Sequence, residues 1–130
     1  NRELSMKFII AALFATALGV LAAPAHATQQ LMASPSYHDF GQTYIGNRPS
    51  SLVNVQNIGN EDIPFVNVFT MGDRMNFDVM SFCGYLPKYS SCTIQVQYTP
   101  YSTGFHTIQL QIQGGISTAY VTESGTGIKR

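Results

Sequence analysis

The sequence predicts an all-β protein, an antiparallel β-sandwich of seven to eight short strands, on three observations. Apolar and polar residues alternate with a period of two, as a strand with one buried face requires and a helix does not. Glycine, proline and asparagine recur between the alternating stretches at regular spacing, as they do in sandwich turns. No helical periodicity is present beyond residue 27. A closed barrel is the alternative architecture.

The clearest strand runs from Cys92 to Tyr98. Its even-numbered positions are cysteine, isoleucine, valine and tyrosine, and its odd-numbered positions are threonine and glutamine. Because Pro100 has no N–H to donate to a sheet, the strand is expected to end near Thr99. The eight residues before it, 84–91, have the composition of a loop and separate the only two cysteines of the chain.

Five stretches before this strand are also predicted to be extended. They cover residues 31–35, 37–40, 52–57, 63–69 and 76–80. Pro64 lies near the start of its strand, a position that tolerates the missing N–H. Residues 41–51 and 71–75 are predicted to be turn or loop.

Two further strands are predicted after Pro100, at residues 105–113 and 116–123. Gly114 and Gly115 form a tight connection of the kind that hairpins use, and residues 124–127 are expected to end the last strand. The alternation predicts that nine side chains face inward from the two sheets. They are Val53, Val55, Phe77, Ile94, Val96, Tyr98, Ile108, Leu110 and Ile112.

The N-terminal region predicts export. Lys7 precedes an apolar run, and Ala25-His26-Ala27 fits the small-x-small pattern of a cleavage site. We therefore interpret residues 6–27 as a signal peptide and residues 28–130 as a single mature domain, located in the periplasm or at the cell surface. An uncleaved anchor is the alternative, but the apolar run is near the short end of what spans a bilayer. Residues 1–5 are expected to be an addition or a misplaced start before Met6.

The expected mature chain is nearly neutral and has no basic patch. Five basic and six acidic residues follow position 27, which leaves a net charge of −1. This argues against nucleic acid or an anionic membrane as a partner. Two cysteines in an exported chain favour a disulfide between Cys83 and Cys92 over a metal pair. Closing that ring would stabilise the fold by about 2.5–3 kcal/mol in the chain-entropy account.

Four sequence features, taken in order, resemble a known class of domain. They are Ser34-Pro35 with Phe40-Gly41; Val53, Val55, Asn57 and Gly59; Cys83 with the run from Ser91 to Pro100; and Ser124-Gly125-Thr126-Gly127. Their order and spacing resemble the immunoglobulin-like domains called ASH (Hydin-type) or choice-of-anchor D, relatives of the major sperm protein fold, over residues 34–127. For a bacterial exported protein, the resemblance implies an immunoglobulin-like sandwich that acts as a surface or periplasmic interaction module, usually in tandem copies.

The chain departs from this pattern in two respects. It holds one copy of the domain, which argues against a simple spacer role. Glu123 stands where the last strand normally places an aliphatic residue. We therefore expect that end of the strand to be solvated or covered by something else.

The sequence offers no catalytic constellation. It lacks a Gly-x-Ser-x-Gly elbow, a glycine-rich phosphate loop and the oxygen spacing of a calcium loop, so we expect neither enzyme activity nor a cofactor. The alternative hypothesis is a small periplasmic copper protein. In it Met71 and Met75 would bind Cu(I) together with His106, because soft thioether ligands suit this ion.

Aromatic residues near the cysteines suggest a recognition surface. Tyr85 and Tyr89 lie between the two cysteines, and Tyr101 lies just past the strand that follows them. Tyrosines on a rigid loop lose little conformational entropy on contact. The alternative is that they cap one end of the core.

The second expected contact surface is an open sheet edge. The first strand, with Leu31 and Met32, and the final strand, 116–123, carry few of the residues that block strand addition. Residues 28–34 would be a donor for it. We therefore expect a non-catalytic extracytoplasmic module that forms a homo-oligomer by strand addition or docks to a cell-envelope protein.

Mass spectrometry of the exported protein checks processing and oxidation together. We expect an N-terminus at Thr28 and a mass lower by two hydrogens than that of the dithiol. Replacing either cysteine should lower the free energy of unfolding by about 2–4 kcal/mol without abolishing the fold. Free thiols at Cys83 and Cys92 in the native protein would contradict the disulfide.

Overall fold

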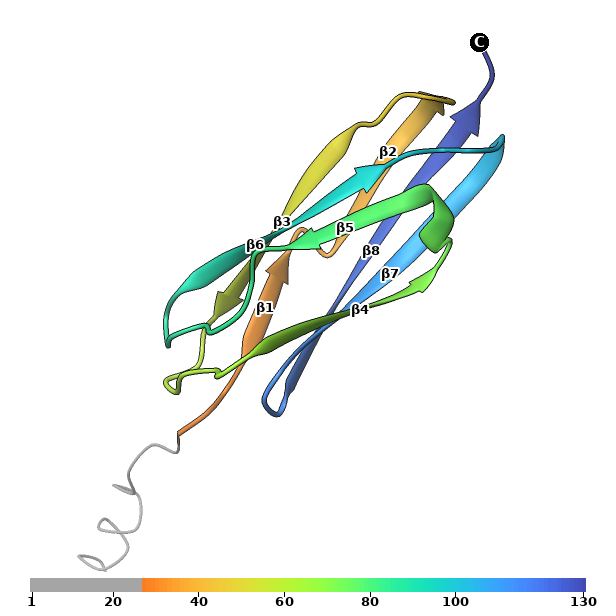
Figure 1. Cartoon of the computed structure of the whole chain (residues 1–130). Helices are drawn as coiled ribbons and strands as arrows, with labels where there is room; N and C mark the ends of the chain where they lie inside the picture. Colours follow the sequence, from red (N-terminus) through yellow and green to blue (C-terminus); the bar gives the residue numbers. More distant parts are fainter. Residues whose placement is uncertain (1–26) are drawn as a thin grey trace, which may run out of the picture.

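The computed structural model describes residues 27–130, so the predicted extra residues 1–5 and the signal peptide up to residue 26 lie outside the described part. Eight strands and one 3-10 turn follow one another (Figure 1). Their bounds are β1 Leu31–Ser34, β2 Tyr37–Tyr44, β3 Ser50–Asn57, β4 Val66–Gly72, η1 Arg74–Asn76, β5 Phe77–Ser81, β6 Ser91–Tyr98, β7 Gly104–Gly114 and β8 Ser117–Ile128. The all-β prediction is confirmed. Within these residues no helix is long and apolar enough to cross a membrane.

The strands form two four-stranded sheets packed as a sandwich. One sheet has the order β1-β3-β6-β5 and the other β2-β8-β7-β4. All neighbours run antiparallel except β2 and β8, which are parallel. The chain changes sheets between β1 and β2, at Pro35 and Ser36, so that β2 pairs with the last strand instead of with β1.

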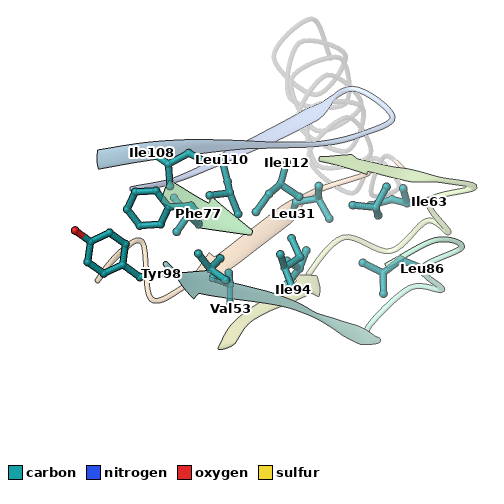
Figure 2. Close-up of a cluster of buried hydrophobic side chains, with 14 residues drawn as sticks. Leu31, Val53, Ile63, Phe77, Leu86, Ile94, Tyr98, Ile108, Leu110 and Ile112 are labelled. Atoms are coloured by element: carbon teal, nitrogen blue, oxygen red, sulfur yellow. The ribbon is translucent and has the colours of Figure 1, made fainter. Parts of the chain in front are cut away.

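The core lies between the sheets, as the alternation predicts (Figure 2). All nine side chains expected to face inward are buried. Five more apolar residues complete the buried cluster: Leu31, Ile63, Val66, Leu86 and Val121. In the sheet that contains β3, β6 and β5, Val53 lies opposite Ile94, and Val79 lies opposite Val96. Apolar side chains of neighbouring strands therefore lie side by side on the inner face of this sheet.

The connection between β5 and β6 is part of this core. Cys83 and Cys92 form a disulfide with an S–S distance of 2.02 Å, which confirms the predicted pairing. Within the closed loop Leu86 is buried, and its backbone exchanges two 2.9 Å hydrogen bonds with Ile63. The loop thus closes one end of the sandwich with a core side chain of its own.

Several predicted boundaries are wrong. β4 begins at Val66 instead of residue 63 and continues through Met71, which we expected in a loop. Ile63 makes only an isolated bridge to Leu86. β2 extends to Tyr44 through a stretch predicted as turn.

The glycines of the Ser-Gly-Thr-Gly stretch do not end the last strand. β8 continues through them to Ile128. A Cβ atom at Gly125 would collide with the ring of Tyr98, and one at Gly127 would collide with the carbonyl oxygen of Ser102. These glycines therefore permit close packing within a strand, one of the roles that glycine has in sheets.

Glu123 is fully buried, so this end of the strand is covered, the second of the two expected arrangements, and is not solvated. Oε1 accepts a 3.0 Å hydrogen bond from Ser51 Oγ, while Oε2 has no partner among the described residues. Burial raises the pKa of Glu123, because a charged carboxylate is poorly solvated there. The Ser51 hydrogen bond and nearby His38 oppose this effect.

Truncation of core residues tests the register. Ile94→Ala and Leu110→Ala should each lower the free energy of unfolding by about 2–5 kcal/mol, because each leaves a cavity in the buried cluster. Chemical denaturation measures the change. Losses below about 0.5 kcal/mol at both positions would mean that the two faces are inverted.

Glu123→Gln tests the buried carboxyl. The folded-state pKa of Glu123 is raised, so the native state retains a proton that the unfolded chain releases above about pH 4.5. Stability should therefore fall as pH rises from that point until the folded-state pKa is passed. Subtracting the wild-type stability profile from that of Glu123→Gln should show a gain that grows with pH. Glu61→Gln, at an exposed position, serves as control, and a flat difference for Glu123→Gln would contradict the interpretation.

Candidate interaction edge

The structure places the predicted tyrosines on the surface but at two ends of the sandwich. Tyr85, Tyr89 and Tyr101 are 61%, 67% and 67% exposed. Tyr85 and Tyr89 lie in the disulfide loop before β6, and Tyr101 follows its far end. An eight-residue strand separates the two groups, a length of roughly 25 Å. The three tyrosines therefore do not form one patch.

Asp62 fastens the disulfide loop to the turn before β4. Its carboxylate accepts a 2.9 Å hydrogen bond from the backbone N–H of Lys88 and a 2.8 Å bond from the hydroxyl of Tyr85. These bonds, the first above all, lower the pKa of Asp62, and the bond to Asp62 raises the pKa of Tyr85. The hydroxyl of Tyr85 is thus already engaged, although most of the residue is exposed.

Of the two contact residues predicted on the first strand, one is buried and the other is exposed. Leu31 is buried in the core, and its N–H donates a 2.9 Å bond to Ser117 Oγ. Met32 is exposed. Within the described chain, residues 31–34 pair along their whole length with β3. Residues 31–34 of the proposed donor segment 28–34 are therefore engaged in their own sheet.

The residues of the copper hypothesis are not brought together. Met71 is on the exposed outer face of β4 and Met75 is in η1. His106 is buried. Its Nδ1 lies 2.7 Å from the Tyr98 hydroxyl and its Nε2 lies 3.1 Å from Ser102 Oγ, so both ring nitrogens have partners. Among residues 27–130 no three histidine, cysteine or acidic side chains gather to hold a metal ion.

The edges differ from the expected ones. β8 lies between β2 and β7, so the prediction that the final strand is an edge is wrong; β1 is an edge, as predicted. The other edges are β5, β2 and β4. β1 has four residues and precedes Pro35, β2 contains Asp39 and an irregular register, and β5 contains Asp78. Short length, bulges and charges are the usual protection of edge strands against pairing.

β4 lacks this protection. Its seven residues include no charge and no proline, and its register with β7 is regular. Phe69 and Met71, on its outer face, are 50% and 46% exposed. Among the four edges, β4 combines the greatest length without irregularity with an outer face that carries Phe69 and Met71 beside the polar Asn67.

The free backbone groups of β4 are identified by the hydrogen bonds at its ends. The N–H of Val66 donates to Gly84 O at 3.0 Å, away from β7, whereas the N–H of Asp73 donates to Thr107 O of β7 at 2.9 Å. In an antiparallel pair the bonding direction alternates from residue to residue. The N–H and C=O groups of Val68 and Thr70 therefore point outward from the sheet edge.

β5 faces the same opening from the other sheet. The N–H of Phe82 donates to Thr93 O of β6 at 2.9 Å, so alternation directs the backbone groups of Phe77, Val79 and Ser81 away from β6. A groove of about 370 Å³ lies between β4 and β5. It is lined by Val68, Thr70, Arg74, Phe77, Asp78, Val79, Ser81 and Ile108.

This edge was not predicted, because alternation does not show strand order and Met71 was expected in a loop. A usable signal was present nevertheless. The segment from Val66 to Gly72 carries apolar side chains at both odd and even positions and no charge. A strand that is apolar on both faces, in a sheet with a solvated outer face, is a candidate for contact with another molecule.

No protein-family model and no curated protein matches the sequence. Solved structures match at low identity. The ASH/PapD-like domain 7 of human CEP192 is 13% identical, with a TM-score of 0.61 over 84% of this chain and 92% of that one. SSP-19, an MSP-domain protein-like family member of Caenorhabditis elegans, is 13% identical, with a TM-score of 0.55 over 72% and 97%.

A third similar structure is the YadV chaperone, which is 11% identical with a TM-score of 0.56. The match covers 75% of this chain and about half of the chaperone, 51%. At such identities the likeness concerns the fold alone. The chain therefore has the immunoglobulin-like sandwich fold shared by ASH, MSP and PapD-like domains.

Proposed function

We propose that this protein is a non-catalytic interaction module, exported to the periplasm or the cell surface, that binds another protein by strand addition at β4. The partner would be a second copy of the chain or a protein of the cell envelope. The observation that carries the proposal is the unprotected edge of β4, with the groove beside it.

Strand addition suits this edge because it supplies hydrogen-bond partners for the unpaired backbone groups of the edge. An incoming extended segment would bond to the outward N–H and C=O groups of Val68 and Thr70. Alternate side chains of the segment would then enter the groove over Ile108 or lie beside Phe69 on the outer face, since successive side chains in a strand point to opposite faces. The edge thus gives affinity through backbone bonds, with apolar contact beside Phe69 on the outer face and a mixed polar and apolar lining in the groove.

The fold neighbours are consistent with this kind of function. They are described as an ASH/PapD-like domain, an MSP-domain protein and a chaperone. These descriptions concern those proteins. For this chain they support an interaction module of unspecified partner.

One hydrogen-bonded arrangement among residues 27–130 resembles part of a catalytic triad, but its composition favours a structural role. Ser102 Oγ, His106 and the hydroxyl of Tyr98 form a chain with separations of 3.1 Å and 2.7 Å. In hydrolase triads the third member is a carboxylate, which stabilises the imidazolium. Here it is a buried tyrosine whose pKa is raised, mainly by burial, so it stays neutral and gives no such help. The groove between β4 and β5 is lined by other residues.

Site-specific photo-cross-linking in the cells of origin tests the proposal. A photoreactive residue at Phe69 should yield a protein adduct, and one at Leu52, an exposed position on an inner strand of the other sheet, should not. Phe69→Lys should abolish binding of the adduct partner, because an edge lysine opposes strand pairing, while Leu52→Lys should leave it intact. Absence of any adduct at Phe69, or equal adducts at both positions, would contradict a contact through β4.

A further inference from the structure

We propose that β4 pairs with β4 of a second copy of this chain, antiparallel and about a two-fold axis at Phe69. The proposal rests on the function proposed above and names its partner. It would join the two β2-β8-β7-β4 sheets into one continuous sheet.

The absence of charge on β4 favours a second copy as the partner. A two-fold contact places the same surface on both sides, so a charge near the axis lies close to the identical charge. The segment Val66–Gly72 has none. β2 and β5 would each bring an aspartate, Asp39 or Asp78, toward its own equivalent.

The ends of β4 fix the register of this pairing. The N–H of Val66 is already used by Gly84 O, and Gly72 has a φ of 114°, outside the extended region. Val68 and Thr70 are therefore the residues with free backbone groups in a regular extended stretch. Both are satisfied together when Val68 lies opposite Thr70 of the second copy, and Thr70 opposite Val68, which forms four hydrogen bonds.

This register brings Phe69 against itself. Phe69 falls between the bonded pairs and becomes a non-hydrogen-bonded pair with Phe69 of the second copy, with Cα atoms about 4.5 Å apart. The two half-exposed rings would meet on the outer face, where close cross-strand aromatic pairs are favourable. On the inner side Val68 and Thr70 would meet their counterparts at the groove, so one contact covers both the apolar outer face and the opening.

Disulfide trapping tests both the partner and the register. Light scattering of the purified wild-type chain should give twice the monomer mass. Under mild oxidation Phe69→Cys should form a covalent dimer, since its Cα separation lies within the reach of a disulfide. Met71→Cys, about 13 Å from its equivalent in this register, and Leu52→Cys should remain monomeric on non-reducing gels. The native cysteines are paired with each other.

The outcomes separate the two proposals. A monomer at all concentrations with no Phe69→Cys dimer overturns self-pairing. Capture of a different protein at Phe69 in cells would then leave strand addition standing. If neither disulfide trapping nor photo-cross-linking gives an adduct at Phe69, both self-pairing and strand addition at β4 are overturned. Equal trapping of all three cysteine variants would indicate random collision and would also overturn the two-fold register. A dimer that is lost in Phe69→Lys and kept in Leu52→Lys would support pairing through β4.

Discussion

The unpaired backbone N–H and C=O groups at the edges of the two sheets are the constraint that decides where this sandwich can bind a partner. A barrel closes on itself, but a sandwich leaves four strands with one side unpaired. On one side of this molecule the chain crosses between sheets from β1 to β2. On the other side β4 and β5 face each other across a groove, and nothing within the described residues fills it. The outward backbone groups of β4 and β5 both border that opening, so a partner strand could reach them there.

The sequence predicted the core well and the sheet order poorly, for one physical reason. Alternation shows which side chains of a strand share a face, and Val53, Ile94 and Leu110 all lie inside as expected. It does not show which strand lies next to which, because pairing depends on contacts between distant segments. β8 was therefore taken for an edge although it pairs on both sides, and β4 was not considered.

Two residues mislead when they are judged from local sequence alone. Gly125 looks like the end of a strand, yet it makes room for the ring of Tyr98 inside one. Glu123 looks like a surface residue because it is an acid, yet it crosses the interior to Ser51. In both cases the partner lies on another strand, so only the three-dimensional arrangement reveals the role. The candidate site could not be predicted from local sequence for the same reason, because its groove is lined by residues from both sheets.

The disulfide loop has a consequence for how sequences of this kind can vary. Surface connections usually accept insertions and deletions because few contacts hold them. This loop supplies Leu86 to the core and holds Ile63 by two backbone bonds. A change in its length would move a core side chain, and with it the Gly84 carbonyl that ends the free stretch of β4. We therefore expect this loop to tolerate changes of length less well than a surface connection that supplies no core side chain.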